Sequence, residues 1–371
     1  MSGTNGRCEP GLIVLLGSGE TSPSIRKVYD WLFERMDAKI DVAILETPAG
    51  FEPNSFAVAD QIGIYLKKHL QNYRPNISII PARKKGTEFS PDDPSILGPL
   101  YGANVIMMGP GSPTYAARQL AQSEAWDALQ SMNRLGKTII FTSATSIAAS
   151  VHALPVYEIY KVGEELHWKH GLDFFGAFGL SLIFIPHWNN NDGGSALDTS
   201  HCYVGTDRYD QLIAQLSHDH VADHPSSHID HTVVGIDENT ALIIDPVAAT
   251  CRVMGPGGVT VIRDGGEKHF PNGTTFDASE MGDFRIPAAA DGIDPAAWAR
   301  TVEGVDVAQQ AKESVATPSD EIMRLVAARV DARTNKDWAG SDELRDQIAT
   351  LGWTVLDTAD GPVLELHTTA D

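Results

Sequence analysis

The fold is decided by the stretch TIIFTSATSIAAS, residues 138–150. Its first five residues are β-branched or aromatic, which is typical of a buried strand. Residues 144–150 are mostly small, which suits a closely packed helix. Ser143 stands at the turn between them, where a hydroxyl is exposed at the carboxyl edge of a sheet and helix amides lie nearby. The stretch therefore predicts a strand, a sharp turn that carries a serine, and a helix.

Several strand-like segments, separated by helix-like segments, precede this stretch. We expect these strands within residues 11–20, 41–50, 76–81 and 103–108. Small polar loops stand at residues 17–20, 46–50, 109–113 and 142–146. Buried strands separated by helices predict an α/β fold with a largely parallel sheet covered by helices on both faces. Ligands of such sheets bind at the carboxyl ends of the strands, where we expect these loops.

The pattern changes after about residue 180. LSLIFIPHW and VVGIDENTALIIDP predict strands, and residues 251–266 predict a hairpin with a glycine-rich turn. Residues 288–318 are rich in Ala, Asp and Pro and predict a linker with room for a short helix. Residues 319–371 carry two helix-start signals and a short hairpin. We therefore expect a main domain over 1–287, a linker over 288–318 and a small, mainly helical domain over 319–371.

Composition and charge exclude several classes of protein. The net charge of −21 argues against non-specific binding to nucleic acids or anionic membranes, because phosphates would be repelled. Cys8, Cys202 and Cys251 are too few and too widely spaced for a disulfide framework or a CxxC metal pair. The N-terminus lacks the apolar segment of a signal peptide, and no apolar stretch is long enough to span a membrane. We expect a cytoplasmic protein without membrane contact.

Three polar residues stand at the ends of apolar runs and could meet at one edge of the sheet. Ser143 follows the first run, His187 follows LSLIFI, and Glu238 lies between two apolar runs in IDENT. A serine becomes a nucleophile when a base removes its proton, and the base needs an acceptor that fixes its tautomer. The pattern predicts a Ser-His-Glu hydrolase. The alternative is that Ser143 only caps the following helix, and Ser146 is a rival nucleophile.

Two further features allow more than one interpretation. Gly109 and Gly111 could present an amide to an oxyanion, together with Ala144, or could simply form a tight turn. The histidine-rich insertion over 217–231 could hold a divalent ion, but metal sites usually lie on fixed elements, so we expect a solvated loop and no metal. No GxGxxG or Walker pattern is present, and we expect no cofactor.

The three elements resemble the serine peptidase family of cyanophycinases and aspartyl dipeptidases. The family's nucleophile motif G-x-S-A-G is similar to residues 141–145. Its histidine follows a G-L-G-L-L strand, as His187 follows residues 179–182. Its acid lies in G-I-D-E-x-T-A-L, which residues 235–242 reproduce closely. The resemblance covers residues 10–287 and implies the class I glutamine-amidotransferase-like fold, with Ser143, His187 and Glu238 as the catalytic residues.

The chain departs from this family at functional positions. Phe141 and Thr145 replace the two glycines that flank the nucleophile. The basic residues that hold an acidic substrate shortly after the histidine are absent, and asparagines and Asp192 stand there instead. Arg208 is the candidate to replace one of them. The resemblance therefore implies either a peptidase acting on a peptide or isopeptide, or a catalytically degenerate relative that binds a peptide or an aminoacyl-tRNA-related partner.

The last fifty residues resemble the small C-terminal domain of cysteinyl-tRNA synthetases. Residues 332–333, 336–339, 342–346 and 357–361 carry the similarity. That domain contacts tRNA in the synthetases, which implies a tRNA partner. However, residues 319–371 contain five Lys or Arg against eleven Asp or Glu, which disfavours phosphate contact. The alternative is a protein-docking or packing role, including the formation of a homodimer.

Overall fold

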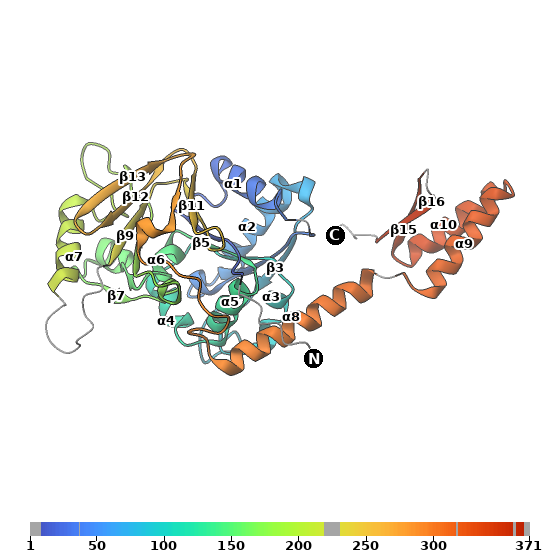
Figure 1. Ribbon diagram of the computed structural model, residues 1–371, viewed down its shortest axis with the longest axis horizontal. Coiled ribbons are helices and arrows are strands. Elements are labelled where there is room, and N and C mark those ends of the chain that lie inside the picture. The colour runs from blue at the N-terminus through green and yellow to red at the C-terminus, as the bar shows by residue number, and fades with distance from the viewer. Residues whose placement is uncertain (1–8, 37, 219–230, 317, 359–360, 367–371) are drawn as a thin grey trace. The chain divides into compact units, whose positions relative to one another are not determined.

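The computed structural model describes residues 9–36, 38–218, 231–316, 318–358 and 361–366 (Figure 1). The chain divides into two compact units, Met1–Gly304 and Val305–Asp371. Within the described residues, no helix combines the length and the apolar character that crossing a membrane requires.

A twisted eight-stranded sheet forms the centre of the first unit (Figure 1). In spatial order its strands are β14 (Thr275–Asp277), β11 (Thr250–Met254), β10 (Ala241–Asp245), β1 (Ile13–Leu16), β5 (Thr138–Thr142), β4 (Val105–Met108), β2 (Asp41–Leu45) and β3 (Asn76–Ile80). The last five of these run parallel to one another, and the first three extend the sheet in antiparallel fashion. The predicted α/β class with a largely parallel sheet is confirmed.

Helices bury both faces of this sheet. The main helices of the unit are α1 (Pro23–Phe33), α2 (Ser55–His69), α3 (Gly98–Tyr101), α4 (Pro113–Leu120), α5 (Glu124–Arg134), α6 (Ala144–Ala148) and α7 (Thr206–His218). Side chains of a strand alternate between the faces, so neighbours in β5 meet different helices. Ile140 belongs to the core cluster that includes α1 and α2, whereas Phe141 contacts Trp126 of α5. This alternation fixes the orientation in which β5 delivers Ser143.

A second sheet of four strands lies beside the first one in the chain's first unit (Figure 1). Its order is β13 (Gly266–Pro271), β12 (Gly258–Arg263), β9 (Thr232–Ile236) and β8 (Leu182–Ile185), with β8 and β9 parallel. The predicted hairpin over residues 251–266 is wrong, because β11 and β12 belong to different sheets. The glycine-rich turn binds polar side chains instead: the amide of Gly258 donates to Asp237, and that of Gly257 donates to Thr240.

Short elements complete the first unit. They are the 3-10 helices Thr47–Ala49, Gln71–Tyr73, Pro94–Ile96, Gly176–Phe178 and Ala278–Met281, the π-helical turn Glu158–Val162, and the strand pair β6 (His152–Ala153) and β7 (Lys169–His170).

The segment predicted as a linker, residues 288–318, contains the 22-residue helix α8 (Pro295–Ala316). Its first turns are packed on the first unit, since Ala297 and Thr301 are buried and Arg300 pairs with Glu124. Burial of these turns explains why an Ala-rich segment is helical here.

In the second unit, the described part of residues 319–371 forms two helices and a hairpin, as predicted from the sequence. The elements are α9 (Asp320–Thr334), α10 (Trp338–Thr350), β15 (Trp353–Thr358) and β16 (Gly361–Leu366). Ser319 caps α9 and Asp337 caps α10. Ile348 and Trp353 lie in the small core. Arg329, which is 4% exposed, makes a bidentate ion pair with Asp357 at 2.8 and 2.9 Å and so joins α9 to the hairpin.

Candidate active site

Ser143 occupies a strained turn between β5 and α6. Its backbone has φ 49° and ψ −103°, a conformation that non-glycine residues rarely adopt. The amide of Ser143 donates to the carbonyl of Leu16 at the end of β1 (2.9 Å), which ties the turn to the neighbouring parallel strand. The hydroxyl is thereby held at the carboxyl edge of the sheet, as in the nucleophile turns of hydrolases.

The two residues that replace glycines around Ser143 fit this turn. The hydroxyl of the fully buried Thr145 accepts a hydrogen bond from the amide of Thr142 (2.6 Å) and donates to the carbonyl of Met108 (2.9 Å). The ring of Phe141 lies edge-on to that of Phe174, with centroids 5.1 Å apart. Thr145 therefore braces the turn with side-chain hydrogen bonds, which a glycine cannot provide.

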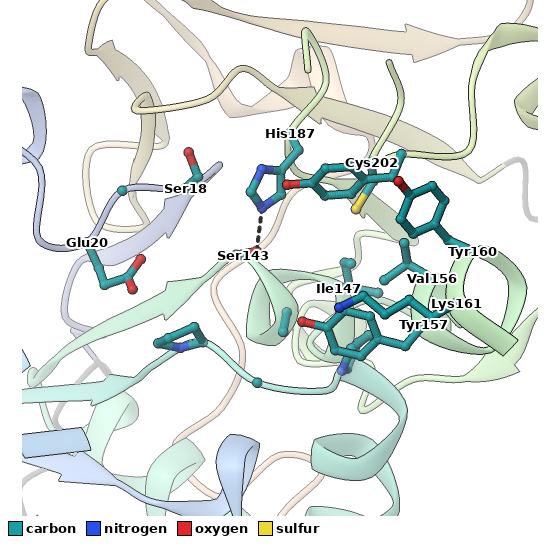
Figure 2. A pocket seen from close by; sticks show the side chains of 16 residues that line it. Ser18, Glu20, Ser143, Ile147, Val156, Tyr157, Tyr160, Lys161, His187 and Cys202 are labelled. Atoms are coloured by element: carbon teal, nitrogen blue, oxygen red, sulfur yellow. Dashed lines mark hydrogen bonds between the residues drawn. The ribbon is translucent and has the colours of Figure 1, made fainter. Parts of the chain in front are cut away.

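His187 follows β8 and lies over the serine hydroxyl. Its Nε2 is 2.8 Å from Oγ of Ser143 (Figure 2). The backbone of His187 also has a positive φ, 50°, and its amide donates to the carbonyl of Gly17 (3.2 Å). The carbonyl of His187 accepts from the amides of Asn190 and Cys202 (3.1 and 3.2 Å). These bonds hold the imidazole at the edge where β1 and β5 end.

Glu238 completes a hydrogen-bonded series with the other two residues. Its Oε1 is 2.7 Å from Nδ1 of His187. The side-chain amide of Asn190, which is 3% exposed, donates to the same oxygen (2.9 Å). The backbone amide of Glu238 donates to Oδ1 of Asn189 (2.9 Å). Two of the asparagines that stand in place of the family's basic residues therefore orient the carboxylate.

The series opens into a cavity of about 450 Å³ (Figure 2). Ser143 and His187 form part of its wall. The other lining residues are Ser18, Gly19, Glu20, Pro110, Gly111, Pro113, Ala144, Ile147, Val156, Tyr157, Tyr160, Lys161, Cys202 and Tyr203. Most of these are apolar or aromatic, with two residues of opposite charge, Glu20 and Lys161. A mainly apolar cavity with a few polar groups is typical of a small-ligand site.

Two of the three predicted oxyanion residues line the cavity, and the third does not. Gly111 and Ala144 both line the cavity, and within the described residues neither of their amides donates a hydrogen bond. Gly111 has φ +155°, and a Cβ there would lie 2.0 Å from the carbonyl oxygen of Pro48. Gly109 does not line the cavity, because it lies against the side chain of Ile62. The amides of Gly111 and Ala144 are therefore the pair available to an oxyanion.

Arg208 does not line the cavity, in contrast to the expectation that it binds substrate. Its guanidinium donates to the backbone carbonyls of Val204 and Tyr203, which lie just before α7. The side chain is therefore bound to its own local backbone. Lys161 is the cation in the wall instead, and sequence analysis missed it because nothing marks its π-helical turn. Glu20 was also missed, although it ends the polar loop after β1.

Neither the predicted rival Ser146 nor Cys202 in the cavity wall is placed to act as a nucleophile. Ser146 is fully buried, and its hydroxyl lies 3.3 and 3.4 Å from the backbone carbonyls of Phe141 and Leu16. Cys202 lines the cavity, but burial raises the pKa of its thiol to about 12. The reactive form of cysteine is the thiolate, so this thiol is unreactive at neutral pH.

The histidine-rich insertion lies mostly outside the described residues, which omit 219–230. In the parts of the chain that the structure describes, no group of three or more His, Cys, Asp or Glu is placed to hold a metal ion.

Comparisons with known proteins distinguish the two units. A solved structure described as a peptidase from an acI-B1 Actinobacterium superposes with a TM-score of 0.54 and 20% identity, covering 73% of this chain and 98% of that one. Residues 318–361 match the family "Cysteinyl-tRNA ligase anticodon binding domain".

Individual ligases repeat the second match. The cysteine–tRNA ligase of Lactobacillus delbrueckii subsp. bulgaricus is 46% identical over 66 residues, 18% of this chain and 14% of the ligase. That of Desulfotalea psychrophila is 44% identical over 63 residues, 16% of this chain and 13% of the ligase. The chain thus corresponds to a small part of these ligases. Both resemblances inferred from the sequence are confirmed to this extent: the larger unit has the fold of a solved peptidase, and the C-terminal segment matches the ligase domain.

Proposed function

We propose that this chain is a serine hydrolase that cleaves a peptide or isopeptide amide through Ser143, His187 and Glu238. The observation that carries the proposal is the continuous series of hydrogen bonds, 2.8 Å from Ser143 to His187 and 2.7 Å from His187 to Glu238, at the wall of a cavity. The strained turn at Ser143 and the fold shared with a solved peptidase support it. The hydrogen bonds of Thr145 also support it, because they brace the turn at a position where the family has a glycine.

The reaction follows from the positions of these groups. Oγ of Ser143 attacks the amide carbonyl carbon while Nε2 of His187 takes the hydroxyl proton. The negative charge on the carbonyl oxygen is stabilised by the amides of Gly111 and Ala144. His187 then gives its proton to the leaving amine as the C–N bond breaks, and water releases the acyl group by the same route. Glu238 holds Nδ1–H and stabilises the imidazolium.

A fluorophosphonate probe tests the proposal without knowledge of the substrate. We expect one covalent adduct on the folded protein, located by mass spectrometry at Ser143. Labelling should disappear in Ser143→Ala and in Ser143→Gly, the second of which tolerates the positive φ, and should persist in Ser146→Ala. Folded wild-type protein that stays unlabelled would contradict the proposal and favour the binding role, in which the cavity only recognises a peptide or an aminoacyl-tRNA-related partner.

For the C-terminal unit we propose contact with protein, either a partner or a second copy of the chain, rather than with tRNA. Three of its four arginines already form ion pairs: Arg329 and Arg333 share Asp357, and Arg345 lies 3.3 Å from Asp342. Few cations remain for phosphates, whose binding relies on Lys and Arg. We expect the full chain to leave bulk tRNA unshifted in a gel at low and at physiological salt. A shift at low salt that fades as salt rises would overturn this proposal.

A further inference from the structure

We propose that Glu20 is the specificity residue of this cavity and that it receives a cationic group of the substrate, such as a free ammonium. This inference rests on the proposed function of the same site and names the chemistry of the substrate that the site takes. It starts from the position of a carboxylate beside the nucleophile that the reaction itself does not use.

The loop between β1 and α1 places Glu20 in the cavity wall. Gly19 has φ +74°, and a Cβ there would lie 2.2 Å from Oδ1 of Asn239, so only glycine fits at this point. Oγ of Ser18 accepts a hydrogen bond from the amide of Asn239 (3.0 Å), which joins the loop to the one that carries Glu238. The hydroxyl of Tyr29 donates to the carbonyl of Glu20 (2.9 Å). The loop that carries Glu20 is therefore fixed on the scaffold of the catalytic residues.

The carboxylate of Glu20 lacks a side-chain partner. Within the described residues, no side chain forms a hydrogen bond or an ion pair with it. It is only partly exposed, and burial raises the pKa of its carboxyl. Its own backbone amide donates to it, and His187 interacts with it electrostatically, but these only partly offset the cost of its burial. A cation that enters the cavity would relieve the rest of that cost. The site thus offers its ligand a carboxylate that no cationic side chain of the described residues pairs with.

The opposite wall of the cavity has different chemistry. Glu20 and Lys161 lie on opposite sides of Ser143 (Figure 2). The ammonium of Lys161 lies 4.9 Å from the ring centroid of Tyr157, among aromatic and apolar side chains. A substrate with its scissile carbonyl at Ser143 therefore meets a negative charge on one side only. A cationic group is favoured there and disfavoured beside Lys161, so the charges also set the direction in which the substrate lies.

Glu20 also lies close enough to His187 to interact with it electrostatically, which allows a different role. A carboxylate that only tuned the imidazole would change the reaction of every substrate alike. A carboxylate that binds a cationic group changes the reaction only of substrates that carry one. The two roles are separated by a pair of probes that share a reactive group and differ only in charge.

The test uses an α-aminoalkyl phosphonate diester and its N-acetyl derivative, which react with the same serine but differ in the ammonium. We expect wild-type protein to react with the free amine roughly tenfold or more faster than with the acetylated probe, as one charge-assisted contact implies. Glu20→Gln should lose most of this preference and react with the acetylated probe as wild-type protein does. Glu88→Gln removes the same charge from an exposed position outside the cavity and should keep the preference.

The outcomes separate the inference from the function on which it rests. Equal preference in wild type and Glu20→Gln, or an equal loss of rate with both probes, overturns the role of Glu20 but leaves the hydrolase intact. If neither probe reacts, the hydrolase proposal fails. Calorimetry of Ser143→Ala with a short free-amine peptide and its N-acetyl form then decides on Glu20. Tighter binding of the free amine that is lost in Ser143→Ala/Glu20→Gln supports the inference, and equal affinities overturn it.

Discussion

Replacing His187 with asparagine is expected to lower kcat for amide hydrolysis by about 10⁶-fold, the loss typical when the base of such a triad is removed. The imidazole is the group within reach of the serine proton, since Nε2 is 2.8 Å from Oγ of Ser143. Asparagine is chosen because His187 has φ 50°, and asparagine tolerates this region better than alanine. The measurement is kcat on the fastest amide found in a peptide library, together with the rate of fluorophosphonate labelling.

His170→Ala serves as the matched control, since His170 is exposed and does not line the cavity. Its kcat should equal that of wild type. The melting temperature of His187→Asn should stay close to that of wild type, because the contacts that the imidazole loses, with Ser143, Glu238 and Tyr203, lie at the cavity wall and not in the core. A folded His187→Asn protein that keeps its labelling rate would show that another group activates Ser143, and the proposed mechanism would be wrong.

Replacing Glu238 with glutamine is expected to lower kcat by about 10³- to 10⁴-fold. The change removes the charge and keeps the shape. Because the side-chain amide of Asn190 donates to the oxygen that faces His187, the glutamine carbonyl takes this place and the tautomer of His187 is retained. The loss then measures how much the negative charge stabilises the imidazolium in the transition state.

The measurement is kcat for Glu238→Gln, with Glu88→Gln as the control for charge. KM should change little, since Glu238 does not line the cavity. In Asn190→Ala the carboxylate loses its second donor but keeps its charge, and we expect a smaller loss than in Glu238→Gln. Retention of activity within about tenfold in Glu238→Gln would remove the carboxylate from the mechanism, because charge loss in a working triad costs more than this.

Much of the fold followed from the residues themselves. The period of apolar residues and the small polar loops were enough to predict the parallel strands and their helices, since burial of one face depends on local spacing. The prediction of a hairpin over residues 251–266 was wrong because strand pairing does not depend on local spacing. Alternation identified β11 and β12 as strands, but the partner of each strand is set by long-range pairing, and the turn between them binds Asp237 and Thr240.

In the candidate site too, some residues could be predicted from the sequence and others could not. Ser143, His187 and Glu238 could be named because each stands at the end of an apolar run. The sequence did not show that they follow strands of two different sheets, β5 in the first and β8 and β9 in the second. Arg208 could not be excluded from sequence, because its spacing after His187 says nothing about the backbone carbonyls that its guanidinium binds. Asn190 is one of the asparagines that stand where the family has basic residues, and its side-chain amide donates to the carboxylate of Glu238.

The sequence by itself determined the strand–turn–helix around Ser143, the α/β class and the small C-terminal unit, because these depend on neighbours a few positions apart. Only the tertiary structure decided which side chains share the cavity. Glu20 and Lys161 are far apart along the chain, and each is an ordinary charged residue in its own segment. Their positions on opposite sides of Ser143 arise from the packing of separate strands and turns, which local sequence patterns do not encode.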